Sequence, residues 1–116
     1  MRLKEFLFEK VANWKTIEGW PNYEVSNTGL VRISKTGKIL KQAEHYGNDK
    51  THPYMRVMLH SSDKRLHARV HRLVATAFLG KPEAGKTEVD HLDGNTRNNT
   101  SGNLEWVTPE ENLLVS

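Results

Sequence analysis

An acid and an imidazole stand side by side in the last third of the chain, at Asp90 and His91, and an amide follows at Asn112. Carboxylate and amide oxygens suit Mg²⁺ or Mn²⁺, ions that keep several waters and take further ligands from a substrate phosphate. A metal-free imidazole can remove a proton from water near neutral pH. These residues could therefore hydrolyse a phosphodiester, with Asp90 and Asn112 holding one divalent ion and His91 activating water.

Each of these residues also has a simpler explanation. An adjacent Asp-His pair at a strand end is more often a hydrogen-bonded surface pair, and an asparagine in a first helical turn is usually a capping residue. Neighbours in a regular strand point to opposite sides, so Asp90 and His91 converge on one ion only if the strand ends or bulges between them. The loop beginning at Leu92 favours such an end.

The elements that must position these side chains are two strands, a loop between them and a helix. The first strand begins at Thr87-Glu88-Val89 and the second covers Asn103 to Thr108. Thr108 suits an N-cap, Pro109 the first helical position, and Glu111 the third, where it completes a capping box. Asn112 then lies in the first turn of the helix. The loop is rich in residues that bond their own backbone or tolerate positive φ: Asp93, Gly94, Asn95, Asn98, Asn99 and Gly102.

These motifs carry a family resemblance. Val89-Asp90-His91-Leu92-Asp93-Gly94-Asn95, Asn98-Asn99, Asn103-Leu104-Glu105-Trp106-Val107-Thr108 and Glu111-Asn112 together resemble the HNH endonucleases, in particular the small phage and intron-encoded homing nucleases. The resemblance implies a ββα-metal core in which His91 is the general base and Asn103 braces the loop. It also implies that Asp90 and Asn112 hold a single Mg²⁺ or Mn²⁺ ion. The last motif position is Asn here instead of His, a variation that the homing branch shares.

A second resemblance covers the first part of the chain. Trp14 to Trp20, Tyr23 to Asn27, Gly29 and Val31-Arg32 are similar to a β-rich nuclease-associated module, and His71 to Phe78 to the helix that links it to such a core. We therefore predict an α+β fold: a small antiparallel β module and linking helix over residues 1–80, then a C-terminal ββα-metal core over residues 81–116.

The residue pattern predicts further elements of the first module. A short amphipathic helix is expected from Arg2 to Ala12, and a helix that buries one stripe is expected from Val70 to a stop at Gly80. That stripe is Val70, Leu73, Val74, Ala77 and Phe78. Between the helices we predict a meander of the runs Tyr23–Val25, Leu30–Ile33 and Ile39–Lys41, a polar loop over Ala43–Pro53, and a hairpin of Tyr54–His60 with Arg65–Val70.

One face of the predicted hairpin is cationic and aromatic, because its strands alternate. Arginines on such a face can replace counterions along a nucleic-acid backbone, although a solvated surface explains each one alone. His67 and His71 have a spacing that can bind zinc on a helix, but the hairpin puts His67 in a strand, so we predict no zinc site there. The predicted DNA contacts are Lys35, Lys38, Lys41, Arg56, Arg65, Arg69 and Arg97.

Composition limits the remaining choices. The chain has 116 residues, a formal net charge of +3, a pI near 9.3 and no cysteine, so disulfides and thiolate zinc sites are excluded. It has no apolar run long enough to span a bilayer, and we expect a cytoplasmic protein of a bacterial host cell that a phage could encode. The expected partner is double-stranded DNA, nicked by a monomer unless two copies assemble on one site. The alternatives are a DNA-binding or regulatory protein that keeps the fold without catalysis, and a structural RNA-binding protein.

Overall fold

The computed structural model describes residues 12–47 and 50–115 and contains eight strands in three small antiparallel sheets. The first sheet is β1-β2-β3, the second is β4-β5-β6, and the third is the two-stranded ribbon β7-β8. The elements are β1 (Trp14–Ile17), β2 (Trp20–Ser26), β3 (Val31–Ile33), β4 (Ala43–His45), β5 (Tyr54–His60), β6 (Arg65–Arg69), α2 (Val70–Phe78), β7 (Glu88–His91), the 3₁₀ turn η1 (Ser101–Asn103), β8 (Leu104–Val107) and α3 (Pro109–Val115).

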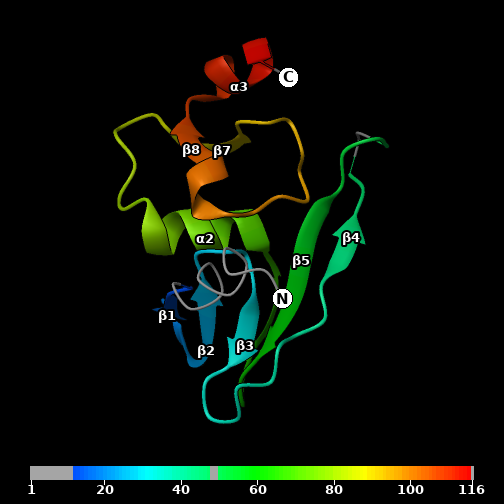
Figure 1. The fold of residues 1–116 in the computed structure, drawn as a ribbon, viewed down its shortest axis with the longest axis vertical. Coiled ribbons are helices and arrows are strands. Elements are labelled where there is room, and N and C mark those ends of the chain that lie inside the picture. The colour runs from blue at the N-terminus through cyan, green and yellow to red at the C-terminus, as the bar shows by residue number, and fades with distance from the viewer. Residues whose placement is uncertain (1–11, 48–49, 116) are drawn as a thin grey trace, which may run out of the picture.

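Helix α2 occupies the centre of the molecule. It lies between the β1-β2-β3 sheet and the β7-β8 ribbon, while β4 and β5 run along one side (Figure 1). One hydrophobic cluster joins these layers, including Val25 of β2, Leu59 of β5, Val74 of α2, and Val89 and Leu104 of the ribbon. Because burial of apolar surface drives folding, this shared core holds the ribbon against the N-terminal sheets.

The helices agree with the sequence pattern where they are described. Helix α2 begins at Val70 directly after β6 and ends before Gly80, whose φ of 76° is a left-handed conformation that suits glycine. Val70 and Val74 of the predicted stripe are buried, and Leu73, Ala77 and Phe78 pack against the core. The helix predicted from Arg2 to Ala12 lies outside the described residues except for its last position. Among the helices described, none has the length and apolar character needed to cross a membrane.

The predicted hairpin is confirmed, although its second strand ends at Arg69 and Val70 begins α2. Arg56 lies opposite Arg69, Val57 opposite Ala68, and His60 opposite Arg65. Val57 and Ala68 are buried against the core, so the arginines leave from the other face.

Two predictions for the N-terminal sheets are wrong. Residues Ala43–His45, which we expected in a polar loop, form the edge strand β4, because their backbone pairs with Tyr54–Arg56 of β5. The run Ile39–Lys41 is not a strand, since only Ile39 makes an isolated bridge, to Arg32. The first strand of the meander is instead β1, which pairs with β2.

Candidate active site

The ribbon carries Asp90 and His91 on neighbouring positions of β7. Asp90 pairs with Glu105 and His91 with Leu104, without any shift of register. The expected break between the two residues is therefore absent. Their side chains leave on opposite sides of the ribbon, so Asp90 and His91 do not converge on one ion through a break in the strand. Asp90 is half-buried, whereas His91 is only 7% exposed.

A single hydrogen bond determines the tautomer of the His91 ring. Its Nε2 atom lies 2.7 Å from Oδ1 of Asn99, a residue that is itself 4% exposed. An amide oxygen only accepts hydrogen bonds, so Nε2 must carry the hydrogen. In the neutral ring, Nδ1 then keeps its lone pair and is the nitrogen able to accept a proton.

The loop after β7 is held by the side chain of Asn103, as the family resemblance implied. The Nδ2 group of Asn103 donates to Asp93 Oδ1 at 2.8 Å and to the carbonyl oxygen of Asn98 at 2.9 Å, and its Oδ1 accepts from the Asp93 amide at 3.0 Å. Hydrogen bonds from the Asn98 side chain, the Asn95 amide and Asn103 lower the pKa of Asp93. The charged form of Asp93 therefore fastens the loop.

Helix α3 begins with the predicted capping box. The Thr108 amide donates to Glu111 Oε1 and the Glu111 amide to Thr108 Oγ1, both at 3.0 Å. These bonds fix the first turn, where Asn112 lies, and α3 packs on both strands of the ribbon.

The predicted metal ligands are the side-chain oxygens of Asp90 and Asn112. Within residues 12–47 and 50–115, no cluster of three or more histidine, cysteine or acidic side chains could hold one. Two oxygens, one anionic and one neutral, fit a hard ion such as Mg²⁺ that keeps most of its shell for water and phosphate. They would not suffice for a closed zinc site.

A second histidine stands beside the His91 ring. The ring centroid of His71 in α2 lies 5.3 Å from that of His91, and Tyr54 stacks on His71 at 4.9 Å. His71 is buried, and its Nδ1 has no hydrogen-bond partner. Burial lowers the pKa of His71 to about 3, with smaller contributions from the nearby His91, Arg72 and Arg69. His71 is thus a neutral part of the wall that supports His91, and since His67 lies in β6, the two do not form a zinc pair.

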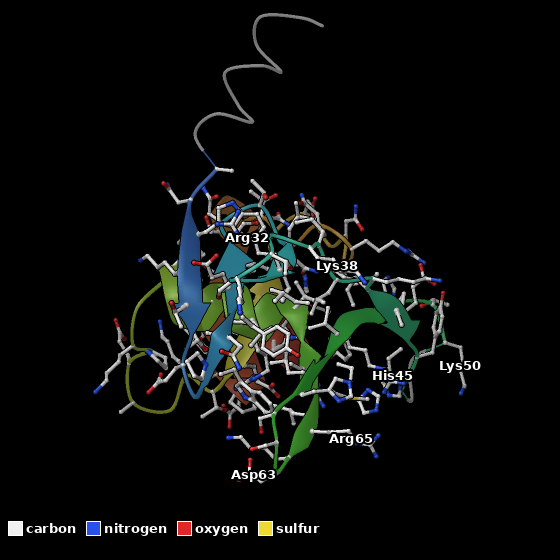
Figure 2. All side chains as sticks on the ribbon, turned by 90° about the horizontal axis from the view of Figure 1, so that it is seen from below. Arg32, Lys38, His45, Lys50, Asp63 and Arg65 are labelled. Atoms are coloured by element: carbon white, nitrogen blue, oxygen red, sulfur yellow. The ribbon has the colours of Figure 1, made fainter. Side chains whose placement is uncertain are left out.

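The predicted DNA contacts fall into three groups. Arg56, Arg65 and Arg69 share the outer face of the β5-β6 hairpin, where Arg56 is half-buried and Arg65 extends away from the body of the molecule (Figure 2). Arg97 lies in the loop of the ribbon and is ion-paired with Glu44. The three lysines Lys35, Lys38 and Lys41 are exposed on the turn after β3 and the segment that follows it.

The sequence did not reveal the parts played by Asn99 and His71. The sequence pattern marks Asn99 only as a loop residue, because its bond to His91 depends on how the loop folds. His71 was considered only as a zinc ligand, because its contact with His91 depends on how α2 packs against the ribbon.

Comparison with known proteins covers nearly all of the described chain. A model of the NUMOD4 motif matches residues 13–60, and a model of the HNH endonuclease family matches residues 68–114. The latter includes α2, which the sequence analysis assigned to the first module, so the division at residue 80 stays a prediction.

Individual relatives agree with both matches. The DNA endonuclease I-HmuI of Bacillus phage SP01 is 45% identical over 102 residues, which are 86% of this chain and 55% of that protein. An uncharacterized HNH endonuclease of Acanthamoeba polyphaga mimivirus is 41% identical over 102 residues, 88% of this chain and 29% of that protein. The chain thus spans about half or less of the length of these relatives.

A solved structure has the same arrangement. It is a structure of the HNH homing endonuclease I-HmuI, solved in work on DNA binding and cleavage by that protein. It superposes on this chain with a TM-score of 0.75 at 42% sequence identity. The match covers 89% of this chain and 56% of that one. The chain therefore carries an HNH endonuclease domain, preceded by a NUMOD4 motif.

Proposed function

We propose that this protein is a divalent-metal-dependent DNA endonuclease that hydrolyses phosphodiester bonds, with His91 as its general base. The observation that carries the proposal is the 2.7 Å bond between His91 Nε2 and Asn99 Oδ1. It leaves Nδ1 of the neutral imidazole with a lone pair that can accept a proton from water. The name of the phage relative I-HmuI, a DNA endonuclease, supports DNA as the substrate. We propose the cytoplasm of a bacterial host cell as the place of action, because this relative belongs to a bacteriophage.

In this mechanism, His91 removes a proton from the attacking water at Nδ1. The ring becomes an imidazolium while Nε2 stays bonded to Asn99, so the ring keeps its orientation through proton transfer. Asn103 holds the loop next to the base and is not itself a reacting group.

Asp90 and Asn112 would hold the divalent ion, Mg²⁺ or Mn²⁺. When bound, the ion supplies positive charge for the scissile phosphate and the leaving oxygen. The two residues contribute one negative charge between them, so the site keeps a net attraction for phosphate. We propose a single ion, since these are the only protein donors that the motif assigns.

DNA would lie across the outer face of the β5-β6 hairpin, where Arg56 and Arg69 are neighbours on adjacent strands. Phosphate contacts of this kind position a duplex and carry no sequence information. With one active site per chain, a monomer cuts one strand, so we propose nicking. Two copies on one site would cut both strands.

Supercoiled plasmid distinguishes this proposal from its alternatives. The protein should convert it to nicked circles when Mg²⁺ or Mn²⁺ is present and not when a chelator is present. Retarded but uncut plasmid under both conditions would instead favour a DNA-binding or regulatory protein. Preferential retention of RNA over DNA, again without cleavage, would favour an RNA-binding protein.

A further inference from the structure

The turn between β2 and β3 touches the loop that holds the His91 ring. The Ser101 amide donates to the carbonyl oxygen of Asn27 at 2.8 Å. A Cβ placed on Gly29 would lie 3.1 Å from both Cβ and the carbonyl oxygen of Asn99. Ordinary van der Waals contact begins at 3.4 Å, so no larger residue fits at Gly29 unless Asn99 moves. The NUMOD4 part of the chain thus reaches the residue that bonds the proposed base.

The turn itself is firmly held. The buried hydroxyl of Ser26 accepts from the Leu30 amide at 3.0 Å and shares a 2.8 Å hydrogen bond with the Thr28 hydroxyl. The Gln42 side chain donates to the carbonyl oxygen of Gly29 at 2.7 Å. Gly29 has a φ of 93°, which L side chains rarely adopt. Because these hydrogen bonds hold the turn in place, a side chain added at Gly29 would displace Asn99 and not the turn.

Asn99 connects the turn at Gly29 to the ring of His91. It is buried, its backbone meets Gly29, and its side-chain oxygen accepts from Nε2 of the ring. If Asn99 were displaced or lost its acceptor, the proton of the neutral ring could move to Nδ1, and the nitrogen proposed to accept the proton of water would lose its lone pair.

We propose that Gly29 and Asn99 are positioning residues for the reaction, through which the NUMOD4 turn sets the tautomer of His91. The inference rests on the proposed function, because it takes His91 as the base. It adds that the nuclease domain depends on the preceding motif for its chemistry. Asn99 sets the tautomer by accepting a hydrogen bond from Nε2. Gly29 acts indirectly, because it has no side chain that would displace Asn99.

Three glycine variants of the full chain separate the contact from the backbone strain. Gly19 and Gly37 also have positive φ, 83° and 75°, but a Cβ on either would meet nothing within 4 Å. Gly29→Ala, Gly19→Ala and Gly37→Ala should therefore all lose some thermal stability, since each strains a left-handed residue. Only Gly29→Ala should also slow nicking, with unchanged DNA affinity, by less than the roughly 100-fold that a misplacement of a base by about 1 Å costs, because Asn99 has to move by less than that.

The tautomer can be read without any activity. ¹⁵N chemical shifts of the His91 ring, measured at alkaline pH where imidazole is neutral, should report hydrogen on Nε2 in the wild type, Gly19→Ala and Gly37→Ala. Asn99→Ala should give a mixture of tautomers and the same loss of nicking rate as Gly29→Ala. Asn99→Asp keeps an acceptor oxygen, so it should restore the Nε2 hydrogen.

Two results would overturn the inference. One is an Asn99→Ala protein that keeps the wild-type ring shifts, and the other is a Gly29→Ala protein that matches Gly37→Ala in both ring shifts and nicking rate. If Gly29→Ala does not fold, the Asn99 variants decide the matter. A wild type that never nicks DNA would contradict the proposed function, whereas the ring shifts would still test the positioning.

Discussion

The guanidinium of Arg97 and the carboxylate of Glu44 lie 2.7 Å apart, although 53 positions separate them in the chain. Tyr46 completes the group: its hydroxyl is 3.0 Å from Glu44 and 3.3 Å from the Arg97 Nη2 atom. Hydrogen bonds from Arg97 and Tyr46 lower the pKa of Glu44, which stays charged. The loop of the nuclease ribbon is thus tied to the edge strand β4, and Arg97, a predicted DNA contact, already has an anionic partner.

This pair makes Glu44 a competitor of DNA for Arg97. If Arg97 contacts a phosphate, Arg97→Gln should reduce the slope of log affinity against log salt by about 0.9. Glu44→Gln should tighten DNA binding, since the guanidinium no longer has to leave a carboxylate. Fluorescence anisotropy across a salt series measures both changes. If Arg97→Gln has the same salt slope as the wild type, Arg97 does not contact DNA and only holds the loop against β4.

The face of the β5-β6 hairpin should contribute affinity without sequence preference. Replacing Arg56, Arg65 and Arg69 together with Gln should weaken binding to all duplexes and lower the salt slope by roughly one for each lost contact. Lys81→Gln, an exposed cation in the segment between α2 and β7, is the matched control and should change little. If the triple variant keeps the wild-type salt slope, this face does not contact DNA.

Local sequence patterns anticipated the elements whose determinants are themselves local. The β5-β6 alternation, the Thr108-Glu111 capping box and the stop of α2 before Gly80 follow from side-chain periodicity and turn chemistry. Strand β4 was missed because Ala43–His45 has no strand pattern of its own and is extended only because β5 offers it a backbone edge. Pairing of that kind depends on the tertiary fold.

Buried His71 should make the protein sensitive to acid. Its pKa is about 3 in the folded chain and near 6.5 when unfolded, so the unfolded state binds more protons between these values. Stability should therefore fall as pH drops through this window, by up to about 1.4 kcal/mol per pH unit from this group. Urea unfolding at about pH 7 and about pH 5 measures the loss.

His71→Phe, which keeps a ring between Tyr54 and His91, should remove most of that loss. His67→Gln, at an exposed histidine of β6, should not. Equal losses in the wild type and His71→Phe would show that other groups cause the acid sensitivity.

The two proposed metal ligands should respond differently to substitution. Asp90→Ala should lose both metal binding and cleavage. Asn112→Asp keeps an oxygen and adds negative charge, so it should bind Mn²⁺ more tightly yet cleave more slowly, because the charge weakens the Lewis acid and repels phosphate. Calorimetric titration of Mn²⁺ beside a nicking assay measures both. Normal nicking by Asp90→Ala would remove this site from the mechanism.

The candidate site was predictable by residue type and motif order, and its geometry was not. The sequence placed His91 at the end of a strand and Asn112 in the first turn of a helix, and the structure has them there. Asn103 was expected to begin the second strand, but it ends the 3₁₀ turn η1 just before β8. The sequence did not foresee that pairing continues through His91, because strand ends depend on the partner strand β8. Nor did it foresee that Asn99 bonds the ring, because that bond depends on the path of the irregular loop between them. The approach of Asn99 to Gly29 joins segments far apart in the chain and depends on the tertiary fold.

The rate at which His91→Ala nicks supercoiled plasmid in a single turnover with saturating Mn²⁺ is the most direct test of the central claim. Loss of a general base typically costs about 100-fold to 10,000-fold, so the variant should be slower by that factor while its DNA affinity stays unchanged. Its thermal stability should fall, because the buried ring and its hydrogen bond to Asn99 are lost, so the assay is run well below the unfolding temperature of the variant. Leu92→Ala, at the exposed neighbouring position, should keep nearly the full rate. Nicking by His91→Ala at the wild-type rate would contradict the account.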